Sequence, residues 1–183
     1  MTGEARLDAL TEADFPVLAA LARTIWHAHY ATIVSAAQID YMLADRCTPE
    51  NLRHYLPAKD RWMYLLRLSA IPVGYCSWAR TATPDEMKLE QLYLRHEHKG
   101  KGLGGLMLRH IETHARSLGC RTLSLQVNKQ NMNAIAVYRR SGFTVREEIV
   151  LDIGKGFVMD DFVMEKTLWQ EQVSSRKNIP AAE

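Results

Sequence analysis

The sequence predicts one α/β domain of the α+β type, with a mixed, mostly antiparallel sheet of six to seven strands and helices on both faces. Short apolar or alternating segments bounded by turn residues recur along the chain, as expected for strands. Amphipathic segments with recognisable caps lie between them, as expected for helices. With 183 residues, 47% of them hydrophobic, the chain can bury one sizeable core. Residues 1–168 are expected to form the domain and residues 169–183 a polar C-terminal tail.

The N-terminal third is expected to contain a strand, at residues 5–10, and three helices. Thr11 and Asp14 match a capping box, which opens the first helix. Ser35 and Gln38 match a second box, and Thr48 before Pro49 opens a third, short helix. In the first helix, apolar residues recur at three- and four-residue spacing and are expected to be buried: Phe15, Leu18, Leu21, Ile25 and Trp26.

The rest of the chain is expected to alternate strands with two longer helices. Residues 62–68 and 73–79 form a hairpin joined by residues 69–72, and a further strand ends at Leu94. A helix over 103–118 stops at Gly119, and a strand follows at 122–127. A helix over 131–141 ends at Gly142. Residues 146–152 and 160–168 are expected to close the sheet as a hairpin around residues 154–156.

The most informative segment is the glycine loop at residues 99–105, which reads Lys-Gly-Lys-Gly-Leu-Gly-Gly and joins a predicted strand to a predicted helix. Such a loop presents bare backbone N–H groups at the positive end of a helix dipole, an arrangement that binds phosphate. The glycines could equally make a tight turn and a close helix packing. The loop also satisfies a dinucleotide fingerprint, but the expected acidic residue about 20 positions later is missing. A Walker loop is excluded because no Gly-Lys-Ser/Thr follows.

A second motif decides between these interpretations. Asn131, Ala134 and Tyr138 open the next predicted helix, and Ser141-Gly142-Phe143 follows. Together with the glycine loop, this motif resembles the GNAT superfamily of acyl-CoA-dependent N-acyltransferases, nearest to its small-amine or polyamine-type members. The resemblance covers nearly the whole chain and implies the GNAT fold. One departure is Lys99, which stands where the family usually has Arg or Gln.

The resemblance implies acetyl-CoA as co-substrate. The loop amides are expected to bind its diphosphate, Asn131 to bind the pantetheine amides, and Ala134 to leave room for that arm. A backbone N–H of Leu92 or a neighbour is expected to polarise the thioester carbonyl. The expected coenzyme-binding residues are Leu92, Tyr93, Leu94, Lys99, Gly100, Lys101, Gly102, Leu103, Gly104, Gly105, Asn131 and Ala134.

Glu90 and Tyr138 are the expected catalytic residues. A primary ammonium must lose a proton before it can attack, and Glu90 lies where small-amine relatives carry a glutamate base that often acts through water. Gln126 occupies the place where other relatives have this glutamate, and it is neutral. Tyr138 is expected to protonate the departing thiolate. A solvated strand carboxylate remains an equal interpretation of Glu90. For Tyr138, the distance from the glycine loop favours the catalytic role over that of a half-buried core aromatic.

The acceptor is expected to be a small-molecule or peptide amine. The resemblance implies a groove formed by the early helices and the closing hairpin, with Trp26, Tyr30 and Asp160 as its binding residues. Carboxylates there would suit a cationic amine. His29, Asp40, Tyr41 and Asp161 are further candidates for this groove.

Composition excludes several other classes. The net charge of +2 and the absence of Lys/Arg blocks argue against nucleic acid. No apolar run approaches a membrane span. The N-terminus lacks a signal sequence, and three scattered cysteines suggest no disulfide framework, so a cytoplasmic protein is expected. No metal is expected, because the histidine pairs lack a third ligand at fitting spacing.

Two hypotheses from other classes remain open. A catalytically silent acyl-CoA sensor would bind the coenzyme without turnover, and retention of both Glu90 and Tyr138 argues against it. An NAD(P)-binding protein is disfavoured by the missing acidic residue. The sequence leaves a homodimer possible, since dimers are frequent among GNAT relatives.

Overall fold

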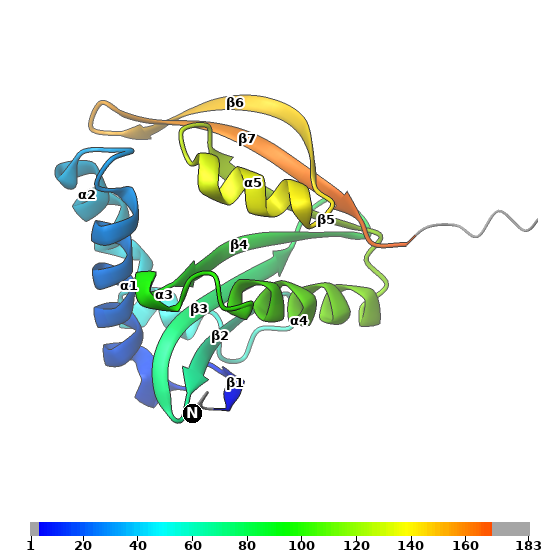
Figure 1. Cartoon of the computed structure of the whole chain (residues 1–183), viewed down its shortest axis with the longest axis horizontal. Coiled ribbons are helices and arrows are strands. Elements are labelled where there is room, and N and C mark those ends of the chain that lie inside the picture. The colour runs from blue at the N-terminus through cyan, green and yellow to red at the C-terminus, as the bar shows by residue number, and fades with distance from the viewer. Residues whose placement is uncertain (1–3, 170–183) are drawn as a thin grey trace, which may run out of the picture.

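The chain folds around a seven-stranded sheet, seen in a computed structural model that describes residues 4–169 (Figure 1). Within these residues the strands lie in the order β1-β2-β3-β4-β5-β7-β6. The elements are β1 (Ala5–Ala9), η1 (Glu12–Asp14), α1 (Phe15–Tyr30), α2 (Ala36–Arg46), α3 (Pro49–Arg53), β2 (Arg61–Leu68), β3 (Ile71–Arg80), β4 (Glu86–Leu94), η2 (His96–His98), α4 (Leu103–Ser117), β5 (Thr122–Asn128), α5 (Met132–Arg140), β6 (Thr144–Gly154) and β7 (Phe157–Thr167).

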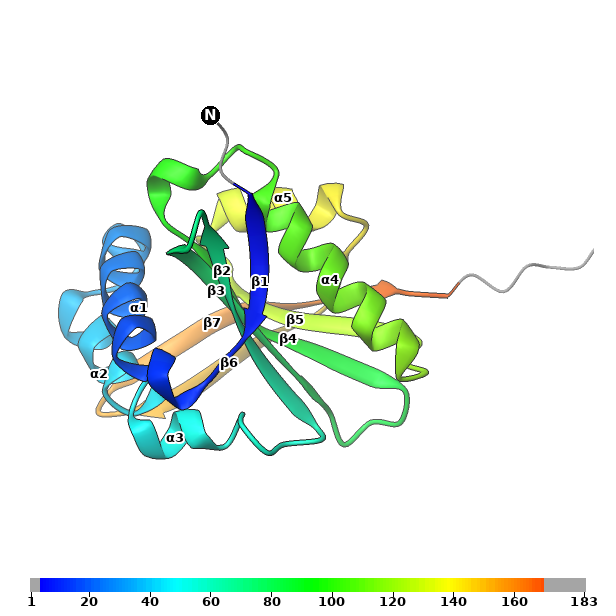
Figure 2. The same cartoon turned by 90° about the horizontal axis from the view of Figure 1, so that it is seen from below.

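Helices cover both faces of this sheet, as the sequence predicts (Figure 2). On one face, α4 buries Met107 and Ile111 against Trp78 of β3. On the other, α1, α2 and α3 pack over β2 and β3, and Leu18 and Leu52 are fully buried there. The two apolar cores fix the helices to the sheet from opposite sides. No helix of the described residues is long and apolar enough to cross a membrane.

The pair β4 and β5 determines where a site can form. It is the parallel pair of the described sheet, and its pairing runs only from Glu86–Thr122 to Leu89–Leu125. Beyond it, β4 continues to Leu94 and β5 to Asn128 without pairing to each other. The two strands therefore splay apart toward their C-terminal ends.

A β-bulge accompanies the splay. Ser77 of β3 pairs with Gln91 and Trp78 pairs with Leu89, so Glu90 is the extra residue on β4. A bulge shifts the alternation of side chains by one. Leu89 and Leu92 consequently both contact the core under α4, and Glu90 faces away from it.

The helix caps follow the expectations closely. Thr11 and Asp14 form the predicted capping box, and the hydroxyl of Thr48 accepts from the N–H of Asn51. Ser35 caps α2 by accepting from the N–H of Gln38. The second half of that box does not form, because the Gln38 amide instead donates to the carbonyl of Val158 on β7, 3.0 Å away.

The hairpins differ from the prediction in length. The β2–β3 turn needs only Ser69 and Ala70, both with positive φ, and residues 71 and 72 already belong to β3. The closing hairpin is longer than predicted at its turn end: β6 includes Gly154, β7 begins at Phe157, and residues 155 and 156 form the turn. Of the expected C-terminal tail, Trp169 donates from Nε1 to the carbonyl of Cys120, and residues 170–183 lie outside the described part.

Candidate active site

The glycine loop lies between η2 and α4, at the N-terminal end of that helix. Gly100 and Gly102 have φ of 75° and 78°, a left-handed conformation that other residues avoid. A Cβ added to either would meet no atom within 4 Å, so the space in front of the loop is open. In the described chain, the N–H groups of residues 100–102 make no backbone hydrogen bond, and those of the first helical turn have no partner within the helix. Free backbone amides of this kind can bind an anion.

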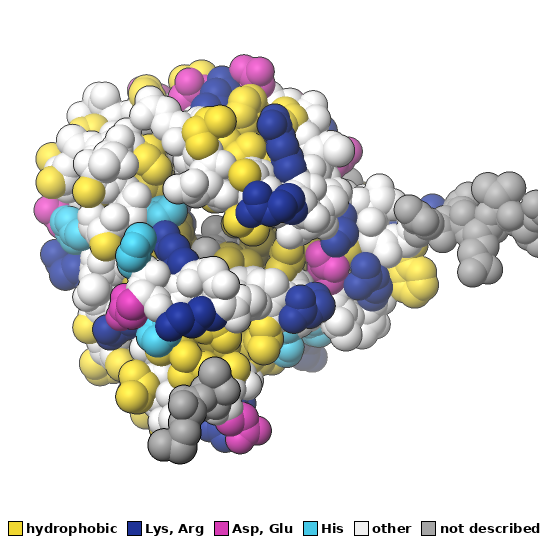
Figure 3. Space-filling view, in the orientation of Figure 1, with side chains coloured by type: hydrophobic (Ala, Val, Ile, Leu, Met, Phe, Trp, Pro, Cys, Tyr) yellow, Lys and Arg dark blue, Asp and Glu magenta, His cyan; other side chains and the backbone are white. Residues whose placement is uncertain are grey.

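Asn131 lies across the opening from this loop, at the start of α5. Its Oδ1 accepts from the N–H of Ala134 at 3.3 Å, which caps the helix. Its Nδ2 is 2.9 Å from Nε2 of His29 on α1. Asn131 is 7% exposed, so its side chain is held firmly in place. Figure 3 shows the surface hollowed between α4 and α5, with Lys, Arg and His side chains near its rim.

His29 contacts both the glycine loop and the α5 motif. Besides Asn131, it has Lys99 at 3.4 Å from its Nδ1. Burial, and then the charge of Lys99, lower the pKa of His29 to about 4, so the ring is neutral at physiological pH. The amide nitrogen of Asn131 can only donate, so it donates to Nε2 of the neutral ring.

Tyr30 of α1 and Tyr93 of β4 form a tyrosine cluster next to the part of β4 that does not pair with β5. The hydroxyls of Tyr30 and Tyr93 are hydrogen-bonded at 2.9 Å. Tyr138 of α5 packs edge-on against Phe143, with ring centroids 5.7 Å apart. Burial raises the pKa of Tyr138, and the charge of Tyr30 raises it further. Tyr138 therefore keeps its proton at neutral pH.

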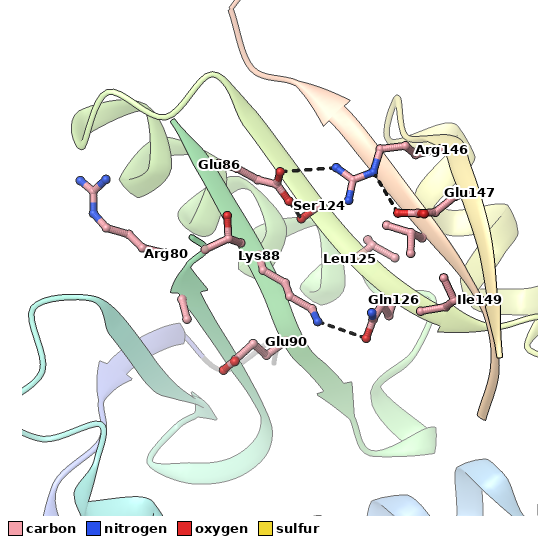
Figure 4. A pocket seen from close by; sticks show the side chains of 13 residues that line it. Arg80, Glu86, Lys88, Glu90, Ser124, Leu125, Gln126, Arg146, Glu147 and Ile149 are labelled. Atoms are coloured by element: carbon pink, nitrogen blue, oxygen red, sulfur yellow. Dashed lines mark hydrogen bonds and ion pairs between the residues drawn. The ribbon is translucent and has the colours of Figure 1, made fainter. Parts of the chain in front are cut away.

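Glu90 faces a cavity of about 400 Å³ on the side of the sheet away from α4 (Figure 4). Its Oε2 accepts from the hydroxyl of Tyr55 at 3.0 Å. Burial and the neighbouring Glu90 raise the pKa of Tyr55 to about 12, so Tyr55 remains a donor. Polar and charged side chains dominate the cavity lining: Arg80, Thr81, Glu86, Lys88, Glu90, Ser124, Gln126, Arg146 and Glu147, with Ala79, Leu125, Ile149 and Val163.

Two basic side chains of this cavity, Arg146 and Lys88, differ in their partners. Arg146 pairs with Glu86 and Glu165. Lys88 instead donates to Oε1 of Gln126 at 3.1 Å (Figure 4). In the described residues no carboxylate lies within ion-pair distance of Lys88, so its charge stays available within the cavity.

The three expected acceptor residues lie in different surroundings. Tyr30 belongs to the tyrosine cluster. Trp26 is 2% exposed and donates from Nε1 to the hydroxyl of Tyr75, which makes it part of the core beneath that cluster. Asp160 has an exposed carboxylate paired with Lys129, whereas the adjacent Asp161 is buried.

Other candidate groups pack into the core. Trp78 donates to Nδ1 of His114, and the His110 ring packs at a tilt against Tyr64. Burial raises the thiol pKa of Cys76 and Cys120, so neither is a ready nucleophile. Within residues 4–169, no group of three or more His, Cys, Asp or Glu side chains could hold a metal ion.

The sequence comparison decides the family. The Acetyltransferase (GNAT) family model matches residues 23–143, which include both the glycine loop and the α5 motif. The chain belongs to the GNAT family. The matched region begins within α1 and ends after α5, so it contains every element that borders the splay except the closing hairpin.

Individual relatives of this GNAT protein match less completely. A spermidine N(1)-acetyltransferase of Thermoplasma acidophilum is 27% identical over 151 residues, covering 80% of this chain and 90% of the relative. Streptothricin acetyltransferase of Streptomyces lavendulae is 37% identical over 71 residues, 39% of this chain and 35% of that protein. This chain thus spans about a third of that relative. The crystal structure of the PaiA N-acetyltransferase of Thermoplasma acidophilum with coenzyme A superimposes with a TM-score of 0.77 at 24% identity, covering 90% of this chain and 99% of that one.

Two residues around Glu90 were not predicted from the sequence: Lys88, which lines the same cavity, and Tyr55, which donates to the Glu90 carboxylate. Lys88 precedes Glu90 by two positions on a strand, so the period-two pattern could have placed both on one face. Tyr55 follows the short helix α3 and touches Glu90 only through the tertiary fold, and no local signal reveals it.

Proposed function

We propose that this chain transfers an acetyl group from acetyl-CoA to a primary amine by direct attack. The single observation that carries the proposal is the open splay between β4 and β5, bordered by the glycine loop and Asn131. The free amides of the loop suit a diphosphate. The amide of Asn131 suits the pantetheine arm, which would pass between α4 and α5 toward the tyrosine cluster.

Glu90 is the proposed base, acting directly or through water. It borders the acceptor cavity at the bulge, and Tyr55 holds its carboxylate. The acceptor ammonium loses one proton to Glu90, and the neutral nitrogen then forms a bond to the acetyl carbon. That carbon is polarised by a backbone N–H of β4 near Leu92, on the edge that β5 leaves open beyond Leu89.

Tyr138 is the proposed acid. As the carbon–sulfur bond breaks, Tyr138 donates its proton to the departing sulfur, and the second proton of the nitrogen restores Tyr138 through water. One proton in all is released to solvent. The raised pKa of Tyr138 keeps it protonated at neutral pH, as this role requires.

The acceptor is proposed to be a cationic amine. Carboxylates at the cavity, above all Glu90, suit such a group. The similarity to a spermidine acetyltransferase over 80% of the chain supports the same class.

Thiol release from acetyl-CoA with a panel of amines tests this function. The panel contains spermidine, lysine, an N-terminal peptide and an aminoglycoside, and at least one should be acetylated. Glu90→Gln should lower kcat/KM about a hundredfold, with the largest loss below neutral pH, where the acceptor most needs a base. Glu50→Gln, an exposed acid at the start of α3, is the matched control and should behave as wild type.

Two results would overturn parts of the proposal. Binding of acetyl-CoA without turnover of any amine would indicate the silent sensor. Wild-type rates in Glu90→Gln would remove Glu90 from the mechanism.

A further inference from the structure

Asp161 carries a buried carboxylate oxygen that nothing in the described chain satisfies. The residue is 5% exposed, and its Oδ1 has no hydrogen-bond partner. A buried charged oxygen without a partner is costly and uncommon in folded proteins. Lys129 is paired with Asp160 and Glu148 and makes no ion pair with Asp161, and the interaction of Asp161 with the side chain of Asn128 leaves Oδ1 without a partner among the described residues. An unsatisfied acceptor of this kind is explained if a ligand supplies the missing donor.

The side chain of Asp161 faces the acceptor side of the sheet. Asp161 lies opposite Asn128 on β5, two residues before Val163 on β7. Side chains two apart on a strand share a face, and Val163 lines the cavity that contains Glu90. Asp161 also interacts electrostatically with Tyr30 and with Lys88. It therefore borders the region between the tyrosine cluster and the cavity.

Glu90 and Asp161 flank this region from opposite sides. Glu90 is on β4 and Asp161 on β7, with β5 between them in the sheet. Neighbouring strands are about 4.8 Å apart, so two spacings separate the backbones by about 10 Å, and the splay adds to this. Since Tyr55 holds the carboxylate of Glu90 on β4 and the carboxylate of Asp161 is buried on β7, the two side chains offer separate positions for cationic groups.

We propose that Asp161 binds a second cationic group of the acceptor, distal to the amine that reacts near Glu90. The preferred acceptors are then aliphatic diamines or triamines. This inference rests on the proposed function and specifies its acceptor. The positive charge of Lys88, which is held by Gln126, would repel a cation placed midway between the two carboxylates. An acceptor whose two amines are joined by an uncharged methylene chain avoids this repulsion.

The test compares two acceptors of equal length, 1,5-diaminopentane and pentylamine, which differ in the distal ammonium. Wild type should show at least a tenfold higher kcat/KM for the diamine, expressed mainly in KM. Asp161→Asn should reduce this preference to about threefold or less. Lys88→Gln should increase it, because the repulsive charge is removed, and this variant gives an independent result if Asp161→Asn folds poorly. Asp160→Asn, on the exposed neighbour, is the matched control and should keep the wild-type preference.

The outcomes separate this inference from the proposed function. Equal use of the diamine and pentylamine by wild type would overturn the role of Asp161 and leave the amine acetyltransferase intact. Preference for 5-aminopentanoate over the diamine would likewise overturn it and assign an anion subsite to Lys88. Absence of turnover with every amine would overturn the proposed function itself, and this inference with it.

Discussion

Nε2 of His29 on α1 lies 2.9 Å from Nδ2 of Asn131 at the start of α5. This contact joins two elements 102 residues apart in the chain. One of them, α1, borders the side of the sheet where the acceptor is proposed to bind, and the other carries the motif proposed to bind pantetheine. Lys99 of the glycine loop touches the same imidazole. His29 therefore holds the side chain of Asn131 in place and is a positioning residue of the proposed site.

Replacing His29 by Ala is expected to weaken acetyl-CoA binding by about 1 kcal/mol, roughly fivefold, the usual value of one partly buried hydrogen bond. Titration calorimetry measures this change. His29→Gln, whose carbonyl can accept from Asn131, should recover part of the affinity. His54→Ala, on an exposed residue after α3, should change nothing. Unaltered affinity in His29→Ala would show that Asn131 needs no support from α1.

The lowered pKa of His29 also predicts a pH dependence of stability. The folded protein binds a proton at His29 less readily than the unfolded chain, whose histidine titrates near 6.5, because the folded pKa is about 4. Stability should therefore fall as pH drops from 6.5 toward 4, and the full contribution is present above 6.5. Urea unfolding across this range should show a shallower decline for His29→Gln than for wild type. If the free energy of unfolding declined equally with pH in the two proteins, the burial of a neutral His29 ring would be contradicted.

Gly102→Ala separates backbone strain from ligand binding. The left-handed φ of 78° should lower stability by about 1 kcal/mol, and the distorted loop should weaken acetyl-CoA binding tenfold or more. Gly119→Ala is a matched control, because Gly119 also has φ of 78° and open space around its Cβ position, but it lies at the other end of α4. It should show the same loss of stability with normal affinity. A loss of affinity in both variants would indicate a general effect on α4.

Asp161→Asn is expected to stabilise the free protein at neutral pH. Burial raises the pKa of Asp161 above its usual 3.8, and the charge of Asp160 raises it further. The folded state then holds this proton to higher pH than the unfolded chain does, so stability falls as pH rises above 3.8. Asparagine avoids that cost. The expected result is a higher Tm for the variant than for wild type at pH 7.5 and little difference in Tm near pH 3.5. A clearly lower Tm for the variant at pH 7.5 would mean that the carboxylate of Asp161 has a stabilising partner in the native protein.

Local signals were enough to predict most of the fold. The caps at Thr11, Ser35 and Thr48 each form because their side chains act within one helical turn. Gly119 and Gly142 stop their helices because both adopt positive φ. Ser69 and Ala70 adopt positive φ without being glycine, which turn preferences do not anticipate.

The candidate site was less predictable where it depends on long-range contacts. The glycine loop and Asn131 have recognisable patterns, and the structure brings them to one opening. The burial of Asp161 and the exposure of Asp160 depend on how β7 pairs with β5, and two adjacent aspartates look alike in sequence. The bulge at Glu90 cannot be predicted from the alternation of polar and apolar residues along β4, because it is defined only by the pairing of β4 with β3.

Calorimetric titration of acetyl-CoA, coenzyme A and NADH into the wild-type protein tests the central claim most directly, with Gly102→Ala in parallel. Saturable binding of acetyl-CoA and coenzyme A at one site, weakened in Gly102→Ala, with no heat from NADH, is the predicted result. Absence of acetyl-CoA binding, or binding of NADH alone, would contradict the assignment of the glycine loop to a coenzyme A diphosphate and the acetyl transfer that depends on it.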